Sequence, residues 1–142
     1  FEAAVSLKHI GTMIREGYES HTDSALYTHS LPDEVTLADI FTYAGTDQFA
    51  RELLDRIATY FAIGLNNVLM IVDPELIILQ GIYVDAGDGF IDMIRTKLGE
   101  LSLPRVRRDL SIVFTDFGLE RGAVGAGCFG VAQYFGEAEL YK

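Results

Sequence analysis

The chain has 142 residues, the length of one domain, and 49% of them are hydrophobic, which is enough for an independent core. Its net charge of −10 argues against a nucleic-acid surface, because acidic groups repel a phosphate backbone. Polar residues interrupt the longest apolar run at Asn66, Asn67 and Asp73, so no membrane-spanning helix is expected. The single cysteine, Cys128, excludes an internal disulfide and, without a recognisable secretory signal, predicts a cytoplasmic protein.

The first part of the chain is predicted to consist of helices joined by a polar loop. Apolar residues recur at roughly helical spacing over 3–18, which predicts a helix there. The stretch 20–34 is rich in Ser, Thr and Asp and is predicted to be a loop. Thr36 precedes a second periodic segment, 37–44, and its hydroxyl can cap a short helix.

A longer helix is predicted to run from a cap at Asp47 to about Val72. Beyond Tyr60 it is apolar nearly all round, which indicates burial on several sides and contacts with a partner. Asp73 precedes Pro74, and a proline ring disfavours helical geometry at the residue before it. The helix is therefore expected to end at this pair.

The second part of the chain is predicted to alternate strands with helices. The apolar run 76–80 is typical of a strand covered on both faces, and 111–117 is the second strand. A helix over about 87–100 separates them, so a right-handed crossover and a parallel pair are expected. The residues that this helix should turn inward are Phe90, Ile91, Ile94 and Leu98. A last helix is expected over about 121–135.

That last helix contains GAGCFG (125–130), which matches the letters of a dinucleotide-binding fingerprint. The fingerprint belongs in the turn directly after a strand and needs another strand downstream, and neither condition is met here. We therefore interpret the small residues as a helix that packs its backbone tightly against a neighbour. Cys128 is interpreted as an inert core thiol.

Other polar clusters give no specific prediction of a site. His21, Asp23 and His29 share one loop and could ligate a metal, but their spacing matches no recognised ligand pattern. The basic cluster at 105–108 could touch an anion, although a solvated connection is the preferred interpretation. No pair of carboxylates can be placed across a cleft from spacing alone, so neither a catalytic nor a metal-binding residue is assigned.

One stretch resembles a known family. IGLNNVLMIVDPELIILQG (63–81) resembles the hallmark of the ROK family, which takes its name from repressors, open reading frames and sugar kinases. Further segments resemble the family in the same order: FEAAVS (1–6), LADIFTYAGTDQFARELL (37–54) and LPRVRRDLSIVFTDFGLERGAVGAGCFGVA (103–132). Each segment alone is a weak signal, but their order and spacing over residues 1 to about 135 are specific.

The resemblance implies an α/β fold of the actin-like (RNase H-like) type, in which this chain is the C-terminal lobe, a βαβ core with several packing helices. Glu2 matches a glutamate that in the family hydrogen-bonds sugar hydroxyls, a task that suits a carboxylate. The family's zinc motif, catalytic aspartate and phosphate loop, and any DNA-binding domain, are expected upstream. The chain opens at Phe1 and not at Met, which agrees with a segment of a longer protein.

The turn after the first strand separates two classes within the family. Family kinases carry a Gly-Gly doublet there, because a nucleotide must approach the backbone closely. This chain has Gln80, Gly81 and Ile82, and the two side chains would crowd a nucleotide, which argues against ATP binding. The departure resembles the family's transcriptional regulators, which sense sugars or sugar phosphates.

We therefore expect the C-terminal lobe of a bacterial, homo-oligomeric, carbohydrate-responsive regulator that touches DNA only through an upstream domain and touches no membrane. Two alternatives stay open. One is the corresponding lobe of an ATP-dependent sugar kinase of the glucokinase or fructokinase type. The other is an interaction module with neither activity.

Overall fold

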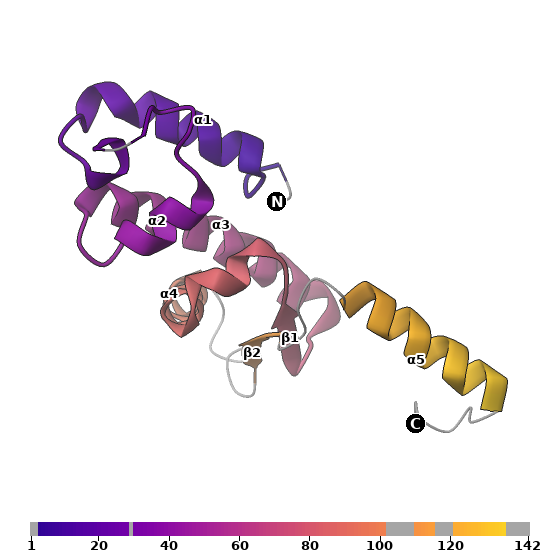
Figure 1. Ribbon diagram of the computed structural model, residues 1–142. Helices are drawn as coiled ribbons and strands as arrows, with labels where there is room; N and C mark the ends of the chain where they lie inside the picture. Colours follow the sequence, from indigo (N-terminus) through magenta and orange to yellow (C-terminus); the bar gives the residue numbers. More distant parts are fainter. Residues whose placement is uncertain (1–2, 29, 102–109, 116–120, 136–142) are drawn as a thin grey trace.

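The computed structural model describes residues 3–28, 30–101, 110–115 and 121–135 of the chain. Its α-helices in this part are α1 (Leu7–Gly17), α2 (Leu37–Tyr43), α3 (Gln48–Val72), α4 (Asp88–Leu101) and α5 (Arg121–Phe135). Its strands are β1 (Leu76–Leu79) and β2 (Ser111–Phe114), and short 3₁₀ helices are η1 (Tyr18–Ser20), η2 (Ala25–Tyr27) and η3 (Ile82–Ala86). The fold is thus mixed α/β, with α1 to α4 forming one body and α5 standing away from it (Figure 1).

Side-chain caps set the start of three helices. Ser6 accepts a hydrogen bond from the His9 backbone N–H at 3.2 Å, so α1 begins at Leu7, later than predicted. Thr36 and Asp39 form a reciprocal capping box at the start of α2. Asp47 accepts from the Ala50 N–H at 2.7 Å and begins α3. The caps predicted at Thr36 and Asp47 are confirmed.

The end of α3 is also confirmed. Asp73 has φ +48° and ψ +55°, which is the left-handed region, and it lies directly before Pro74. Its N–H still donates to the Leu69 carbonyl at 3.1 Å, so the helix closes with a left-handed residue of the kind usually supplied by glycine. Aspartate tolerates this conformation better than most residues, but at some cost.

The core forms around α3 where it packs against its neighbouring helices. Ile57, Ala58 and Ala62 of α3 are fully buried, and α4 lies along the same helix. The four residues predicted to face inward from α4 are all buried: Phe90, Ile91, Ile94 and Leu98. The charged residues in the first half of α3 lie on its exposed face: Arg51, Glu52, Asp55 and Arg56.

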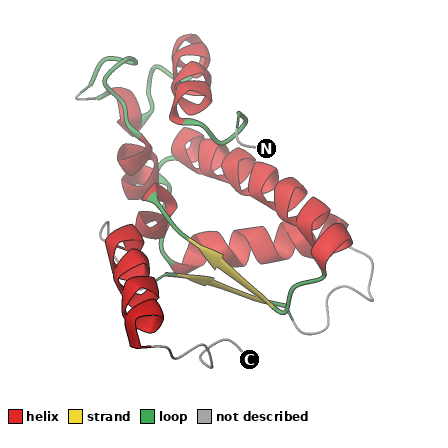
Figure 2. Ribbon diagram, turned by 90° about the vertical axis from the view of Figure 1, so that its right-hand side faces the viewer, coloured by secondary structure: helices red, strands yellow, loops and turns green. Residues whose placement is uncertain are grey.

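The two strands are parallel, as predicted, with Ile77 opposite Ile112 and Ile78 opposite Val113. One face of the pair carries Leu79 and Ile112, which are 8% and 1% exposed. The expectation of cover on both faces is wrong for the described chain. On the other face Leu76 and Ile78 are 51% and 58% exposed, because α3 and α4 occupy the opposite side (Figure 2).

The two outer edges of this sheet differ. The Ser111 N–H donates to the carbonyl of Glu75, directly before β1, and the Thr115 N–H donates to that of Leu79. The carbonyl of Ile112, one residue after Ser111, therefore points away from β1. The Arg95 guanidinium donates to that carbonyl at 2.9 Å. At the free edge of β1, no described residue pairs with the backbone of Ile78.

The predicted burial of α5 and of the end of α3 is wrong as well. In α5 a Cβ on Gly125 or Gly127 would meet no atom within 4 Å, and Cys128 is exposed, so the tight packing and the core thiol are not observed. The far end of α3 is exposed too, with Ile71 at 84%. The described residues thus supply no surface that covers these apolar side chains. None of the described helices has the length and apolarity to span a membrane.

Candidate functional site

The turn after β1 is built on Gly81. Its φ of +95° and ψ of −156° form a conformation that side-chain-bearing residues rarely adopt. A Cβ there would meet no atom within 4 Å, so the backbone angle and not lack of space requires the glycine. Gln80 is exposed and Ile82 is 46% exposed, so both side chains flank an accessible turn.

Tyr83 lies just behind this turn, in η3, and is only 7% exposed. Its hydroxyl donates to the Val5 carbonyl at 2.5 Å, across 78 positions of sequence. Its ring packs edge-on against Phe61 (centroids 4.7 Å apart) and parallel to Phe90 (5.9 Å). Burial raises the pKa of Tyr83 to about 12, so the hydroxyl remains a donor at neutral pH.

The structure therefore brings the β1–η3 turn close to the start of the chain. Glu2, the residue that matches the family's sugar contact, lies outside the described residues. The segment that follows it is ordered by local bonds: Ser6 Oγ donates to the Ala3 carbonyl at 2.8 Å while capping α1. Tyr83 adds the long-range bond at Val5.

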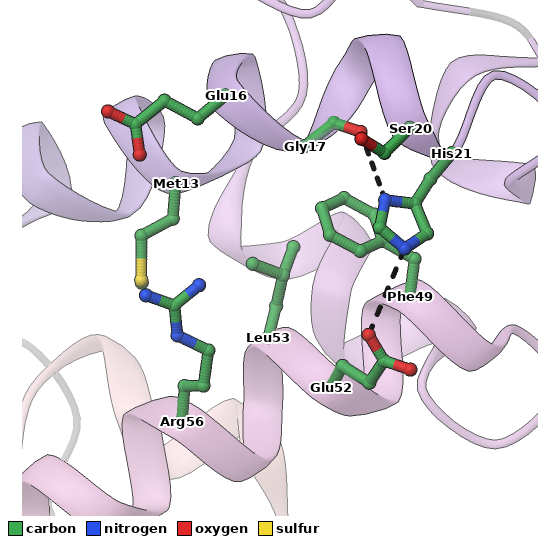
Figure 3. A pocket seen from close by; sticks show the side chains of 9 residues that line it. All are labelled: Met13, Glu16, Gly17, Ser20, His21, Phe49, Glu52, Leu53 and Arg56. Atoms are coloured by element: carbon green, nitrogen blue, oxygen red, sulfur yellow. Dashed lines mark hydrogen bonds and ion pairs between the residues drawn. The ribbon is translucent and has the colours of Figure 1, made fainter.

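A separate pocket of about 250 Å³ opens between the end of α1 and the start of α3 (Figure 3). Its lining mixes acidic, basic and apolar side chains: Met13, Glu16, Gly17, Ser20, His21, Phe49, Glu52, Leu53 and Arg56. The His21 ring stacks on Phe49 with centroids 4.1 Å apart. Its Nδ1 lies 3.0 Å from the Gly17 carbonyl, and its Nε2 lies 3.9 Å from a Glu52 carboxylate oxygen.

His21 is thus a packing residue of this pocket. Of the loop residues weighed as metal ligands, His29 lies outside the described residues, as does the basic cluster at 105–108. In the part of the chain that the structure describes, no three His, Cys, Asp or Glu side chains gather as a metal site requires. The GAGCFG segment lies inside α5 and not in a strand-to-helix turn.

Asp47 ties the loop before α2 to the start of α3. One carboxylate oxygen accepts from the Ser24 hydroxyl at 2.9 Å as well as from Ala50, and the other accepts from the Ala25 N–H at 2.9 Å. Burial by itself raises the pKa of Asp47, but these hydrogen bonds outweigh it and hold the pKa below its usual value. The carboxylate thereby fixes the loop that carries η2.

Sequence reasoning missed Tyr83 and the pocket around His21. The Tyr83 bond joins distant segments, so no local spacing announces it. The only sequence signal for the pocket is the glycine at position 17. The structure shows why it is needed, because a Cβ there would lie 2.0 Å from Cζ of Phe49.

Comparison with known proteins finds a family model and a related enzyme that match most of this chain. The model of the ROK family matches residues 11–131. A glucokinase of Halalkalibacterium halodurans is 28% identical over 128 residues, which cover 89% of this chain and 39% of the glucokinase. The chain therefore spans less than half the length of that relative.

Two solved structures share the fold. A putative sugar kinase from Cytophaga hutchinsonii has a TM-score of 0.81 at 22% identity, over 92% of this chain and 43% of that one. A ROK family transcriptional regulator, described as a homologue of the E. coli MLC protein, has a TM-score of 0.70 at 24% identity, over 80% and 28%. The solved structures that share this fold thus include both a putative sugar kinase and a transcriptional regulator.

Proposed function

Since the chain belongs to the ROK family, we propose that it is the C-terminal lobe of an actin-like, carbohydrate-responsive transcriptional regulator of that family. The observation that carries this proposal is the turn after β1. Gln80 and Ile82 flank Gly81 with exposed side chains, at the place where the family's kinases need an unobstructed backbone for a nucleotide.

The second candidate is the same lobe of an ATP-dependent sugar kinase. The likeness to a glucokinase and to the Cytophaga sugar kinase favours it. Gly81 also keeps a backbone angle that only glycine adopts readily, so this chain retains one glycine of the kinase doublet in a conformation that suits it. The two proposals differ in one property, which is the affinity of the full-length protein for ATP.

In the regulator, a sugar bound in the cleft between lobes contacts Glu2 and shifts the population between two lobe arrangements. Zinc and any DNA-binding domain belong to segments upstream of this lobe. The exposed apolar end of α3 supports a further contact with another lobe or a second subunit, because Met70, Ile71 and Val72 are 59%, 84% and 67% exposed. The charge of −10 supports the absence of a direct DNA contact by this lobe.

Calorimetry of the full-length protein with ATP and with glucose separates the candidates. The regulator binds glucose or another sugar but shows no ATP affinity tighter than about 1 mM, a free energy near −4 kcal/mol. Micromolar ATP affinity together with glucose-dependent ADP release would overturn the regulator in favour of the kinase. Replacing Gln80 with Gly and Ile82 with Gly tests the physical reason, since a gain of ATP affinity is expected if these side chains obstruct the site.

A further inference from the structure

The pocket between α1 and α3 has one wall that is fixed before any ligand enters. The His21 ring lies nearly parallel to Phe49, with 15° between the ring planes, and its Nδ1 is 3.0 Å from the Gly17 carbonyl. Gly17 in turn allows α1 to approach Phe49, since a Cβ at that position would collide with the ring. A ligand therefore meets a surface that need not reorganise, which lowers the entropic cost of binding.

The charged side chains of α3 at this pocket are not paired with one another. Glu52 and Arg56 stand one helical turn apart, a spacing at which opposite charges on a helix surface commonly pair. The Glu52 carboxylate instead accepts from Gln48 Nε2 at 2.9 Å and lies 3.9 Å from His21 Nε2. The Arg56 side chain extends toward Met13 of α1 (Figure 3). The pocket therefore carries a guanidinium at one end and a carboxylate at the other.

Glu16 of α1 adds a second carboxylate to the lining. Within the described part of the chain, neither Glu16 nor Arg56 forms an ion pair. Met13 and Leu53 supply apolar side chains to the same pocket. This lining complements a short molecule that has an anionic group at one end, a cationic group at the other and carbon atoms between them.

We propose that this pocket binds a small zwitterion, an amino acid whose carboxylate pairs with Arg56 and whose ammonium group pairs with Glu52. A guanidinium is suited to a carboxylate because it can donate two parallel hydrogen bonds. A purely anionic ligand would be repelled by Glu16 and Glu52, and a purely cationic one would leave Arg56 unmatched. The volume of about 250 Å³ suits a chain of a few carbon atoms, because drug-sized ligands occupy about 300–1,000 Å³. The site is separate from the Gly81 turn and does not depend on the function proposed above.

Calorimetry of the full-length protein with 4-aminobutyrate tests the site. Butyrate and butylamine are matched probes, because each keeps the carbon chain and lacks one charged group. The Glu52 side chain is 50% exposed, so solvent screens its charge, and a dissociation constant of about 1 mM is expected for 4-aminobutyrate. Loss of one charge-assisted contact should weaken butyrate and butylamine binding by about tenfold or more.

Arg56→Gln should weaken 4-aminobutyrate binding by about tenfold for the same reason. Lys8→Gln is the matched control, since Lys8 is an exposed cation of α1 outside the pocket lining. Both variants lose one positive charge at an exposed position, so their melting temperatures should stay close to that of the wild type. In the wild type, 4-aminobutyrate should also slow amide hydrogen exchange at residues 17–21, which form one wall of the pocket.

Four results would overturn the proposal. The first is no binding of 4-aminobutyrate to the wild type at about 20 mM, well above the expected dissociation constant. The second is equal binding of butyrate or butylamine, which would show that only one charge is recognised. The third is equal weakening in Arg56→Gln and Lys8→Gln, which would indicate a long-range charge effect. The fourth is binding that leaves exchange at 17–21 unchanged, which would place the ligand elsewhere. None of these measurements uses glucose or ATP, so they are independent of the choice between regulator and kinase.

Discussion

Replacing Gly17 with alanine should destabilise the protein, although alanine normally favours a helix. Gly17 has φ −75° and ψ −17°, which alanine adopts without strain, so the effect is purely steric. The added Cβ would lie 2.0 Å from Cζ of Phe49 and less than 3 Å from both Cε atoms, distances that real atoms do not reach. Phe49 is 7% exposed and stacked on His21, so its ring cannot move without disturbing the pocket.

Overpacking of this kind costs about 1–3 kcal/mol, and the helix preference of alanine returns at most ~1 kcal/mol. The expected net loss of about 1–2 kcal/mol corresponds to a melting temperature lower by about 3–6 °C. Gly11→Ala in the same helix is the matched control. Its Cβ would meet only the flexible Arg15 side chain at 3.5 Å, so a small gain in stability is expected.

Thermal and urea unfolding of both variants measure the expected difference in stability. If Gly17→Ala is as stable as Gly11→Ala, the close approach of Phe49 to α1 is refuted. A double variant supplies a further check: Phe49→Leu removes the colliding ring atoms, so adding Gly17→Ala to Phe49→Leu should cost less than adding it to the wild type.

Two further predictions concern Asp47 and Asp73. Asp47→Ala removes the α3 cap and should cost about 1–2 kcal/mol at neutral pH. Because folding lowers the Asp47 pKa, its carboxylate contributes fully above the unfolded pKa of about 3.9 and loses that contribution as the pH falls through the folded pKa. Urea unfolding at pH 7 and pH 3 should show the difference shrinking in acid, and a pH-independent difference would contradict this. Asp73→Gly should gain about 0.5–1 kcal/mol by relieving the left-handed backbone, whereas Asp73→Val should lose stability in the same thermal assay; equal stability of the two would refute the strain.

Features set by local chemistry were predictable from the sequence. The caps at Thr36 and Asp47 and the end of α3 before Pro74 depend on residues within a few positions of one another. The inward face of α4 follows from helical spacing alone. The parallel pairing of β1 and β2 follows from the intervening helix, because a crossover of that length returns the chain in the same direction.

Exposure of the late elements was not predictable in this way. The apolar runs of β1 and α5 predicted burial, but among the described residues Leu76, Ile78 and Cys128 are exposed, and an apolar run does not say which segment would cover it. The Gly81 turn was identified through family resemblance, and its positive φ gives that resemblance a physical reason. Tyr83 could not have been found, because a hydroxyl–carbonyl bond between distant segments leaves no periodic trace in the sequence.

The two edges of the small sheet differ in how readily another strand can pair with them. At β2 the Arg95 guanidinium already occupies the Ile112 carbonyl, and a charged group seated on an edge discourages another strand from docking there. At β1, no charged side chain among the described residues binds the backbone of Ile78, and the Ile78 side chain is part of an exposed apolar face. A third strand can therefore pair with β1 without displacing a charged side chain from the strand edge. An uncovered strand edge beside an exposed apolar face favours self-association between molecules, and among the described residues β1 has both.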